Sequence, residues 1–183
     1  MHPWHNVEAG DQPPDLVNAL IEIPKGSKAK FELDKKSGLI RMDRVLYSAV
    51  HYPANYGFIP QTYCDDHDPL DILVISQEKA VPLCIMRARP VGLIKMLDQG
   101  EADDKIIAIH TDDPEFSEVN RFDELPIHRI REIQQFFREY KTLENKSVKV
   151  EDILPKEEAL EVIKKALKDY QKAKNDGLTF EPR

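Results

Sequence analysis

The run from Leu70 to Ile75 constrains the fold of this chain more than any other segment. Residues 72–75 within it are all apolar, so both faces of an extended strand would be apolar there. Strands of this kind are covered by other parts of the protein on both sides. We therefore predict that residues 70–75 form a central strand of a β-rich body.

Shorter segments with strand character surround this run. They comprise residues 19–23, 28–33, 39–45, 84–97, 105–110 and 148–150. Apolar and polar side chains alternate within 28–33, and a polar turn at 34–38 follows, which predicts a hairpin with 39–45. Pro90 lacks a backbone donor for a sheet ladder, so we predict that it interrupts the strand at 84–97.

Two amphipathic helices are predicted near the end of the sequence, over residues 125–141 and 156–172, where apolar residues recur at helical spacing. The predicted fold class is α+β and mainly β, a small closed barrel with these two helices packed around it. Prolines among polar residues predict an extended arm over residues 1–18. Residues 19–183 have a length that suits a single domain.

The charge balance limits the possible partners. The chain has 26 basic and 33 acidic residues, a formal net charge of −7. This charge disfavours nucleic acid and anionic membranes as main partners, and an anionic substrate would have to arrive with cations. Two cysteines without a CxxC spacing favour a reducing compartment. No apolar run approaches the ~18–20 residues that span a bilayer, and the first ten residues lack a secretory pattern, so we predict a cytoplasmic protein.

The segment from Asp65 to Asp71 has the most informative composition. Asp66, Asp68 and Asp71 lie where a loop enters the buried strand, and carboxylate oxygens are the ligands that Mg²⁺ prefers. An acidic, solvated turn is the alternative, because aspartate is common in turns. A calcium-binding EF-hand is excluded, since the spacing of its alternate ligands and its glycine are missing.

A second acidic segment, residues 98–105, connects two predicted strands. Taken by itself, this segment is more simply explained as an ordinary polar hairpin loop, because polar connections with glycine are expected between strands, and its spacing alone does not decide for a metal site. The wider set of chemically capable residues is more informative. It comprises Glu22, Lys30, Arg44, Tyr52, Tyr56, Asp66, Asp68, Asp71, Asp98, Asp103, Lys105, Tyr140 and Lys141.

In order and context, these residues resemble the soluble family I inorganic pyrophosphatases from about Ile21 to Val150. The family signature Asp-x-Asp-Pro-x-Asp is met by residues 66–71, and further matches occur at 21–24, 30–34, 43–44, 52–57, 95–98 and 137–141. Residues 2–5 and 112–116 look most like the plant-type branch. His67 departs from the family pattern, in which this position more often holds a small residue.

The resemblance implies a five-stranded, OB-like closed barrel and the hydrolysis of inorganic pyrophosphate to two orthophosphates by metal-activated water in an in-line attack. It implies several Mg²⁺ ions per site, pyrophosphate bound as its magnesium complex, and a homo-oligomer. Asp68 would be the general base. The implied metal ligands are Glu22, through water, with Asp66, Asp71, Asp98 and Asp103, and the implied substrate contacts are Lys30, Arg44, Tyr56, Lys105, Tyr140 and Lys141, of which Tyr56 and Arg44 also assist catalysis.

Charge arithmetic supports this division of roles. Two like charges 4 Å apart repel by about 4 kcal/mol at an effective dielectric constant near 20. Four lysines and arginines cannot neutralise six carboxylates and a pyrophosphate, so metal cations must contribute. Two alternatives remain: an inactive homologue that binds phosphate or metal, and a phosphatase for organic phosphates. The second fits less well, because the implied contacts are nearly all charged and offer no apolar pocket.

Overall fold

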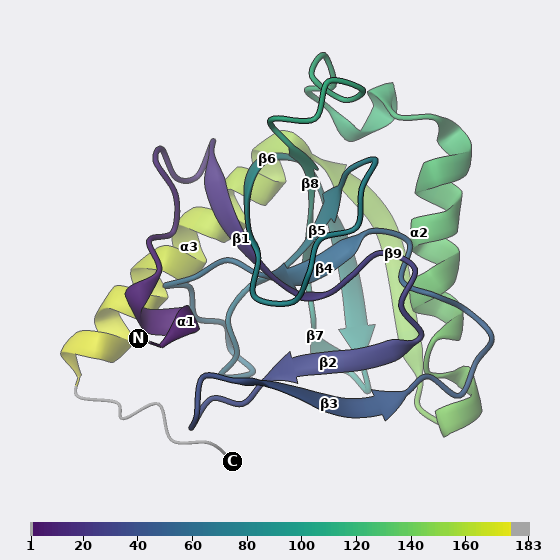
Figure 1. Cartoon of the computed structure of the whole chain (residues 1–183), viewed down its shortest axis with the longest axis horizontal. Helices are drawn as coiled ribbons and strands as arrows, with labels where there is room; N and C mark the ends of the chain where they lie inside the picture. Colours follow the sequence, from purple (N-terminus) through teal and green to yellow (C-terminus); the bar gives the residue numbers. More distant parts are fainter. Residues whose placement is uncertain (1, 177–183) are drawn as a thin grey trace.

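The computed structural model describes residues 2–176, which form a mainly β body flanked by helices (Figure 1). The main sheet has the strand order β1 (Val17–Ile23), β4 (Asn55–Phe58), β5 (Asp71–Ile75), β8 (Lys105–His110), β6 (Ile85–Asp98) and β7 (Glu101–Ala102), with β9 (Val148–Pro155) paired to β6. β1 pairs with β6 as well as with β4. The prediction of a central strand is confirmed, because β5 lies between β4 and β8 and its residues 72–75 are at most 2% exposed.

A hairpin lies beneath the main sheet in the view of Figure 1. Its strands, β2 (Ala29–Leu33) and β3 (Ile40–Val45), form a separate two-stranded antiparallel sheet. This confirms the hairpin predicted from alternation and from the polar turn. The hairpin therefore faces one end of the main sheet rather than extending it.

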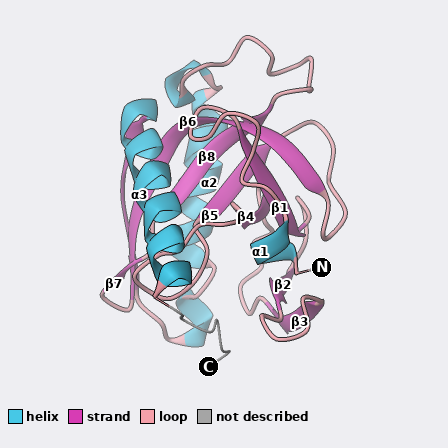
Figure 2. Cartoon of the chain, turned by 90° about the vertical axis from the view of Figure 1, so that its left-hand side faces the viewer, coloured by secondary structure: helices cyan, strands magenta, loops and turns pink. Residues whose placement is uncertain are grey.

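Both predicted helices are present and lie on opposite sides of the main sheet (Figure 2). α2 (Ile127–Glu139) packs Ile130, Ile133 and Phe137 into one core cluster, whereas α3 (Lys156–Asn175) packs Ile163 and Ala166 into another. The short helices are α1 (Pro3–Asn6), η1 (Phe122–Glu124) and η2 (Thr142–Glu144). Among residues 2–176, no helix is long and apolar enough to cross a membrane.

The predicted interruption at Pro90 is wrong. β6 continues from Ile85 to Asp98, and its register with β8 shifts between Pro90 and Gly92. The bulge accommodates the missing donor without ending the strand. β9 is likewise longer than the predicted strand at 148–150, because it pairs with β6 along most of its length.

β4 escaped prediction because its sequence holds asparagine and glycine, which are poor strand formers. A Cβ atom at Gly57 would lie 1.9 Å from the carbonyl oxygen of Leu20, so the close approach of β1 requires glycine there. The predicted arm over residues 1–18 includes two regular elements. It contains α1, and its last two residues already belong to β1. The arm's first residue and residues 177–183 of the predicted domain lie outside the described residues.

Asp113 connects the segment after β8 to the segment after β5 through hydrogen bonds. Its carboxylate accepts hydrogen bonds from the Ser76 hydroxyl at 2.8 Å, from the Gln77 backbone and side chain at 2.7 and 2.8 Å, and from the Glu115 backbone at 3.1 Å. Burial opposes ionisation, but these hydrogen bonds outweigh it and lower the pKa of Asp113 to about 2. The ionised carboxylate therefore stabilises the fold.

We expect Asp113→Ala to lower the free energy of unfolding by roughly 2 kcal/mol at pH 7, since each pKa unit corresponds to about 1.4 kcal/mol. Because the folded pKa is depressed, this stabilisation is present above pH ~4 and disappears as the pH falls towards 2. Urea unfolding at several pH values measures it. Asp112→Ala is the matched control, because Asp112 is 57% exposed and its contacts are weak: a 3.5 Å ion pair with Arg87 and a 3.3 Å hydrogen bond from the Thr111 hydroxyl. Equal stability losses in the two variants would contradict the assignment.

Candidate active site

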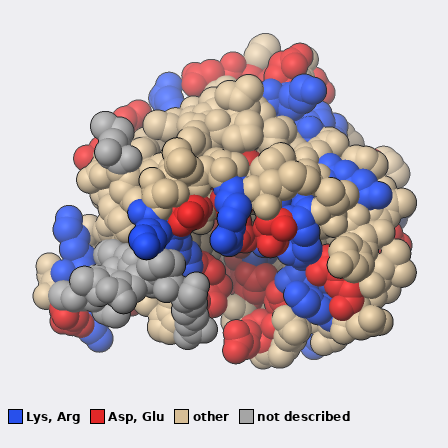
Figure 3. Space-filling model, turned by 60° about the horizontal axis from the view of Figure 1, so that its bottom comes forward, with Lys and Arg blue, Asp and Glu red and all other residues tan. Residues whose placement is uncertain are grey.

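A cleft of about 670 Å³ lies between the hairpin and the end of the main sheet that faces it. The space-filling view from below shows a hollow with acidic side chains inside it and basic side chains around it (Figure 3). Most of the predicted site residues line this cleft. They are Glu22, Lys30, Tyr52, Tyr56, Asp66, Asp68, Asp71, Asp98, Asp103, Lys105, Tyr140 and Lys141.

The parallel pair β5–β8 builds the centre of the cleft. Asp71 and Lys105 are the first residues of these strands and stand opposite each other in the register, so their side chains meet at one sheet edge. The Lys105 ammonium contacts the carboxylates of Asp71 and Asp103 and is only 3% exposed. Tyr56 donates a hydrogen bond of 2.6 Å to the same Asp71 carboxylate. Burial alone would lower the pKa of Lys105, but the two carboxylates raise it, so the ammonium stays charged.

Glu22 links this centre to the hairpin. Its carboxylate, near the end of β1, accepts a 2.6 Å hydrogen bond from the backbone nitrogen of Leu33. Burial, and secondly the negative charge of Asp71, raises the pKa of Glu22 to about 8. A cation placed beside Glu22 would reverse this effect, because an opposite charge favours the ionised carboxylate.

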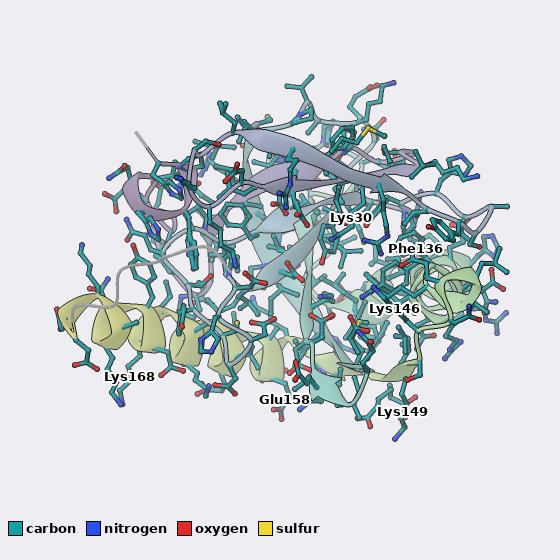
Figure 4. All side chains as sticks on the ribbon, turned by 90° about the horizontal axis from the view of Figure 1, so that it is seen from below. Lys30, Phe136, Lys146, Lys149, Glu158 and Lys168 are labelled. Carbon is teal, nitrogen blue, oxygen red and sulfur yellow. The ribbon has the colours of Figure 1, made fainter. Side chains whose placement is uncertain are left out.

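The opposite wall comes from the end of β6 and from the chain after α2. Lys141 contacts the Asp98 carboxylate, and the neighbouring Tyr140 packs against Phe136 with ring centres 5.3 Å apart. Viewed from below, Lys30 lies on the hairpin and Phe136 on α2 (Figure 4). Helix packing therefore places the polar ends of Tyr140 and Lys141 in the cleft.

The acidic loop before β5 contributes Asp66 and Asp68. The Asp66 carboxylate accepts a 3.1 Å hydrogen bond from the Asp68 backbone, an arrangement typical of aspartate in turns. Burial, and next the charge of Asp103, raises the pKa of Asp66. The Asp68 side chain is 49% exposed at the mouth of the cleft and contacts Lys35.

Arg44 is the predicted residue that does not line the cleft. Its Nε donates to Glu144 at 2.9 Å and its Nη1 to Asp43 at 2.5 Å. Nη2 is buried and has no hydrogen-bond partner among residues 2–176. The distance in sequence hid this arrangement, because Glu144 lies 100 positions from Arg44.

Sequence reasoning missed Lys35 and Trp4, which also line the cleft. Lys35 occupies a turn rich in polar residues, and Trp4 lies in a segment that reads as an arm. The signal available was that Trp4 is the single tryptophan of the chain. A large aromatic side chain in a polar segment usually packs against something.

The donor set fits hard divalent cations by its chemistry. The cleft contains several carboxylates, and Oδ1 of Asp98 is buried without a hydrogen-bond partner in the described chain. Lysine ammonium groups contact these carboxylates. Within residues 2–176, there is no group of three or more acidic, histidine or cysteine side chains that could hold a metal ion as it stands. The lysines therefore neutralise part of the carboxylate charge in the cleft.

The cleft gathers carboxylates and lysines, which suits the binding of an anion together with cations. Residues 19–171 match a family model described as inorganic pyrophosphatase. The chain belongs to the inorganic pyrophosphatase family.

Individual relatives agree with this family. The chain is 54% identical over 93% of its length to soluble inorganic pyrophosphatase 2 of Chlamydomonas reinhardtii, of which it covers 88%. It is 55% identical over 92% of its length to soluble inorganic pyrophosphatase 1 of Arabidopsis thaliana, of which it covers 80%. These similarities confirm the resemblance to the plant-type branch.

Solved structures give the same result for the fold. The inorganic pyrophosphatase of Thermus thermophilus superposes with a TM-score of 0.87 at 38% identity, over 90% of this chain and 97% of that one. The inorganic pyrophosphatase of Helicobacter pylori superposes with a TM-score of 0.86 at 44% identity, over 91% of this chain and 99% of that one. The mainly β architecture with C-terminal helices is thus a pyrophosphatase-like fold.

Proposed function

We propose that this chain is an inorganic diphosphatase that hydrolyses pyrophosphate to two orthophosphates with the help of divalent cations, Mg²⁺ being the natural ion. The observation that carries the proposal is the gathering of carboxylates and lysines from distant segments into one cleft. Asp71 of β5, Asp98 of β6, Lys105 of β8 and Lys141 after α2 all reach it. An acidic cleft of this kind suits an anion that arrives as its magnesium complex.

The acidic residues would hold the cations. They are Glu22, through water, with Asp66, Asp71, Asp98 and Asp103. When bound, Mg²⁺ lowers the pKa of coordinated water and neutralises charge on the phosphate oxygens. Two observations support this role. The raised pKa of Glu22 indicates a carboxylate that lacks sufficient positive charge nearby, and the second oxygen of Asp98 has no hydrogen-bond partner among residues 2–176 although Lys141 contacts the first.

Asp68 would act as the general base. It orients a water molecule for in-line attack on one phosphorus and takes its proton. The oxygen of the water forms a bond to phosphorus while the bridging P–O bond breaks, and the electron pair leaves with the second phosphate. Its position at the mouth supports the role, since a half-exposed carboxylate is accessible to water.

The basic and tyrosine side chains would bind the two phosphoryl groups. Those that line the cleft are Lys30, Tyr56, Lys105, Tyr140 and Lys141. Arg44 would join them by exchanging its contact with Glu144 for a phosphate oxygen, which suits its planar fork. Lysine ammonium groups act as compact charges, and tyrosine hydroxyls add directional donors.

The finer architecture belongs to the same proposal. A five-stranded, OB-like closed barrel is supported by β1, which pairs with both β4 and β6 and so joins the two ends of the strand order β1-β4-β5-β8-β6. We also propose one pyrophosphatase domain over residues 19–183 behind an N-terminal arm, a homo-oligomer, and a cytoplasmic location, which the two free cysteines support. The inactive homologue is disfavoured, because none of the implied ligands and lysines is replaced.

Phosphate release from pyrophosphate tests the proposed activity. We expect rapid release with Mg²⁺, loss of release on adding EDTA, and recovery when Mg²⁺ is restored. ATP is the control substrate, and we expect its turnover to be at least about 100-fold slower, because the charged cleft offers nothing for a base to stack on. A folded sample that releases no phosphate with Mg²⁺ or Mn²⁺ would support the inactive homologue instead.

A further inference from the structure

Lys35 lies at the mouth of the cleft. It was not among the site residues predicted from the sequence. It belongs to the turn at residues 34–38 that joins β2 to β3, and it lines the cleft. Its ammonium contacts the carboxylate of Asp68. The same ammonium lies 5.8 Å from the centre of the Trp4 ring, which also lines the cleft. Lys35 therefore connects the indole to the proposed general base.

Residues 2–6, here called the N-terminal clip, hold the backbone of this turn. A ring nitrogen of His2 lies 2.9 Å from the Lys35 carbonyl oxygen. Gly38 allows the clip to approach, since a Cβ atom there would lie 3.0 Å from Cδ of Pro3. The helix α1, which makes up most of the clip, lies beside the β2–β3 turn (Figure 1). The turn is thus fixed by contacts that do not involve the Lys35 side chain.

The clip is also bonded to the segment that leads into the acidic loop. The indole nitrogen of Trp4 donates to the carbonyl oxygen of Thr62 at 2.8 Å, and the Gln61 backbone donates to the Trp4 carbonyl oxygen at 2.9 Å. Trp4 itself is only 1% exposed. One rigid connection therefore sets both the origin of the Lys35 side chain and the start of the loop that carries Asp68.

The aliphatic side chain of Lys35 allows its ammonium group to move while the Lys35 backbone stays in place. Lys105 is buried between two carboxylates, whereas Lys35 is 30% exposed and its partner Asp68 is 49% exposed. A flexible four-carbon stem carries a compact charge over several ångströms. A multiply charged phosphate anion attracts that charge more strongly than a singly charged, half-exposed carboxylate such as Asp68 does.

We propose that Lys35 is a further substrate-binding residue, whose ammonium moves from Asp68 and the Trp4 ring to the phosphate oxygens when a phosphate anion enters the cleft. The inference rests on the proposed function and extends it to a residue outside the family signature. The movement breaks the ion pair between Lys35 and Asp68, so that Asp68 becomes available to a water molecule. It also changes the electrostatic surroundings of the Trp4 indole.

Trp4 emission and steady-state kinetics test this together. Trp4 is the only tryptophan, so all indole emission comes from the clip. Methylenediphosphonate, which cannot be hydrolysed at its P–C–P bridge, is titrated with Mg²⁺, and inorganic phosphate is titrated alone. Lys35→Met is compared with Lys36→Met, because Lys36 is exposed in the same turn and does not line the cleft.

We expect a saturable change of Trp4 emission in the unaltered protein and in Lys36→Met, and none in Lys35→Met. We also expect Lys35→Met to raise KM for pyrophosphate about tenfold while kcat stays within about twofold. An emission change that survives in Lys35→Met, an unaltered protein without one, or an unchanged KM would each overturn the inference. Absence of pyrophosphate hydrolysis in the unaltered protein is the separate result that refutes the proposed function.

Discussion

The Asp68→Asn variant is expected to hydrolyse pyrophosphate about 10³-fold more slowly than the unaltered protein at saturating substrate and Mg²⁺, within the range that general-base catalysis contributes. The amide keeps the shape of the side chain and can still accept a hydrogen bond, but it cannot take a proton from water. Because Asp68 is half exposed and its side chain forms an ion pair with Lys35 alone within the described part of the chain, the fold should be almost unaffected. Initial rates of phosphate release and a thermal unfolding curve measure both quantities.

Asp65→Asn is the matched control for this variant. Asp65 lies in the same acidic loop, but its side chain is 92% exposed, and its ion pair with Lys165 is 3.5 Å long. We expect its rate to stay within about twofold of the unaltered protein, since an exposed pair contributes little. An active Asp68→Asn variant would remove Asp68 as the base and leave the diphosphatase activity itself standing.

Lys105→Met is expected to have the largest effect on stability. The substitution retains the length of the side chain but leaves Asp71 and Asp103 facing each other without their shared ammonium. Removing one partner of a buried ion pair typically costs about 3–5 kcal/mol, because a charge remains buried without compensation. We expect a loss of this size in EDTA, measured by denaturant unfolding.

Mg²⁺ should restore part of this lost stability, since a ligand that binds only the folded state stabilises it by mass action. The control is Lys95→Met: Lys95 is 46% exposed, and its ion pair with Asp104 is 3.8 Å long, so we expect a change below about 1 kcal/mol. A Lys105→Met protein as stable as the control would show that the two carboxylates are neutralised by other groups.

The parts of the fold that follow from local patterns were predictable from the sequence. Residues 72–75 are apolar on both faces, and they form the centre of the main sheet. The polar turn at 34–38 indicated the hairpin. Two segments with helical spacing became α2 and α3. In each case, the physical signal lies within a stretch of about 5–20 residues.

Features that depend on tertiary contacts could not be predicted in this way. Whether Pro90 ends a strand depends on the register of β8, which provides a bulge. Gly57 suits β4 because β1 passes close to it, and β1 lies more than thirty positions earlier. Propensity describes a residue alone, whereas these outcomes depend on its neighbours in space.

The candidate site also has a part that could be predicted from the sequence and a part that depends on tertiary contacts. The resemblance to the pyrophosphatase family, with its acidic signature, indicated most of the lining residues, and the structure gathers them in one cleft. Sequence could not reveal that Arg44 pairs with Glu144 and lies outside the lining, or that His2 of the N-terminal clip contacts the backbone of Lys35. Both depend on contacts between residues that lie far apart along the chain.

The parallel register of β5 and β8 ties the chemistry of this protein to the kinetics of its folding. Asp71 and Lys105 are 34 positions apart, and β6 lies between their strands in the sequence. Their meeting must wait until a long loop has closed, a step whose entropy cost is paid before the contact forms. Recovery of turnover during refolding should therefore coincide with the slow, cooperative closure of the β5–β8 pair, and a nascent chain that ends before β8 has no catalytic centre.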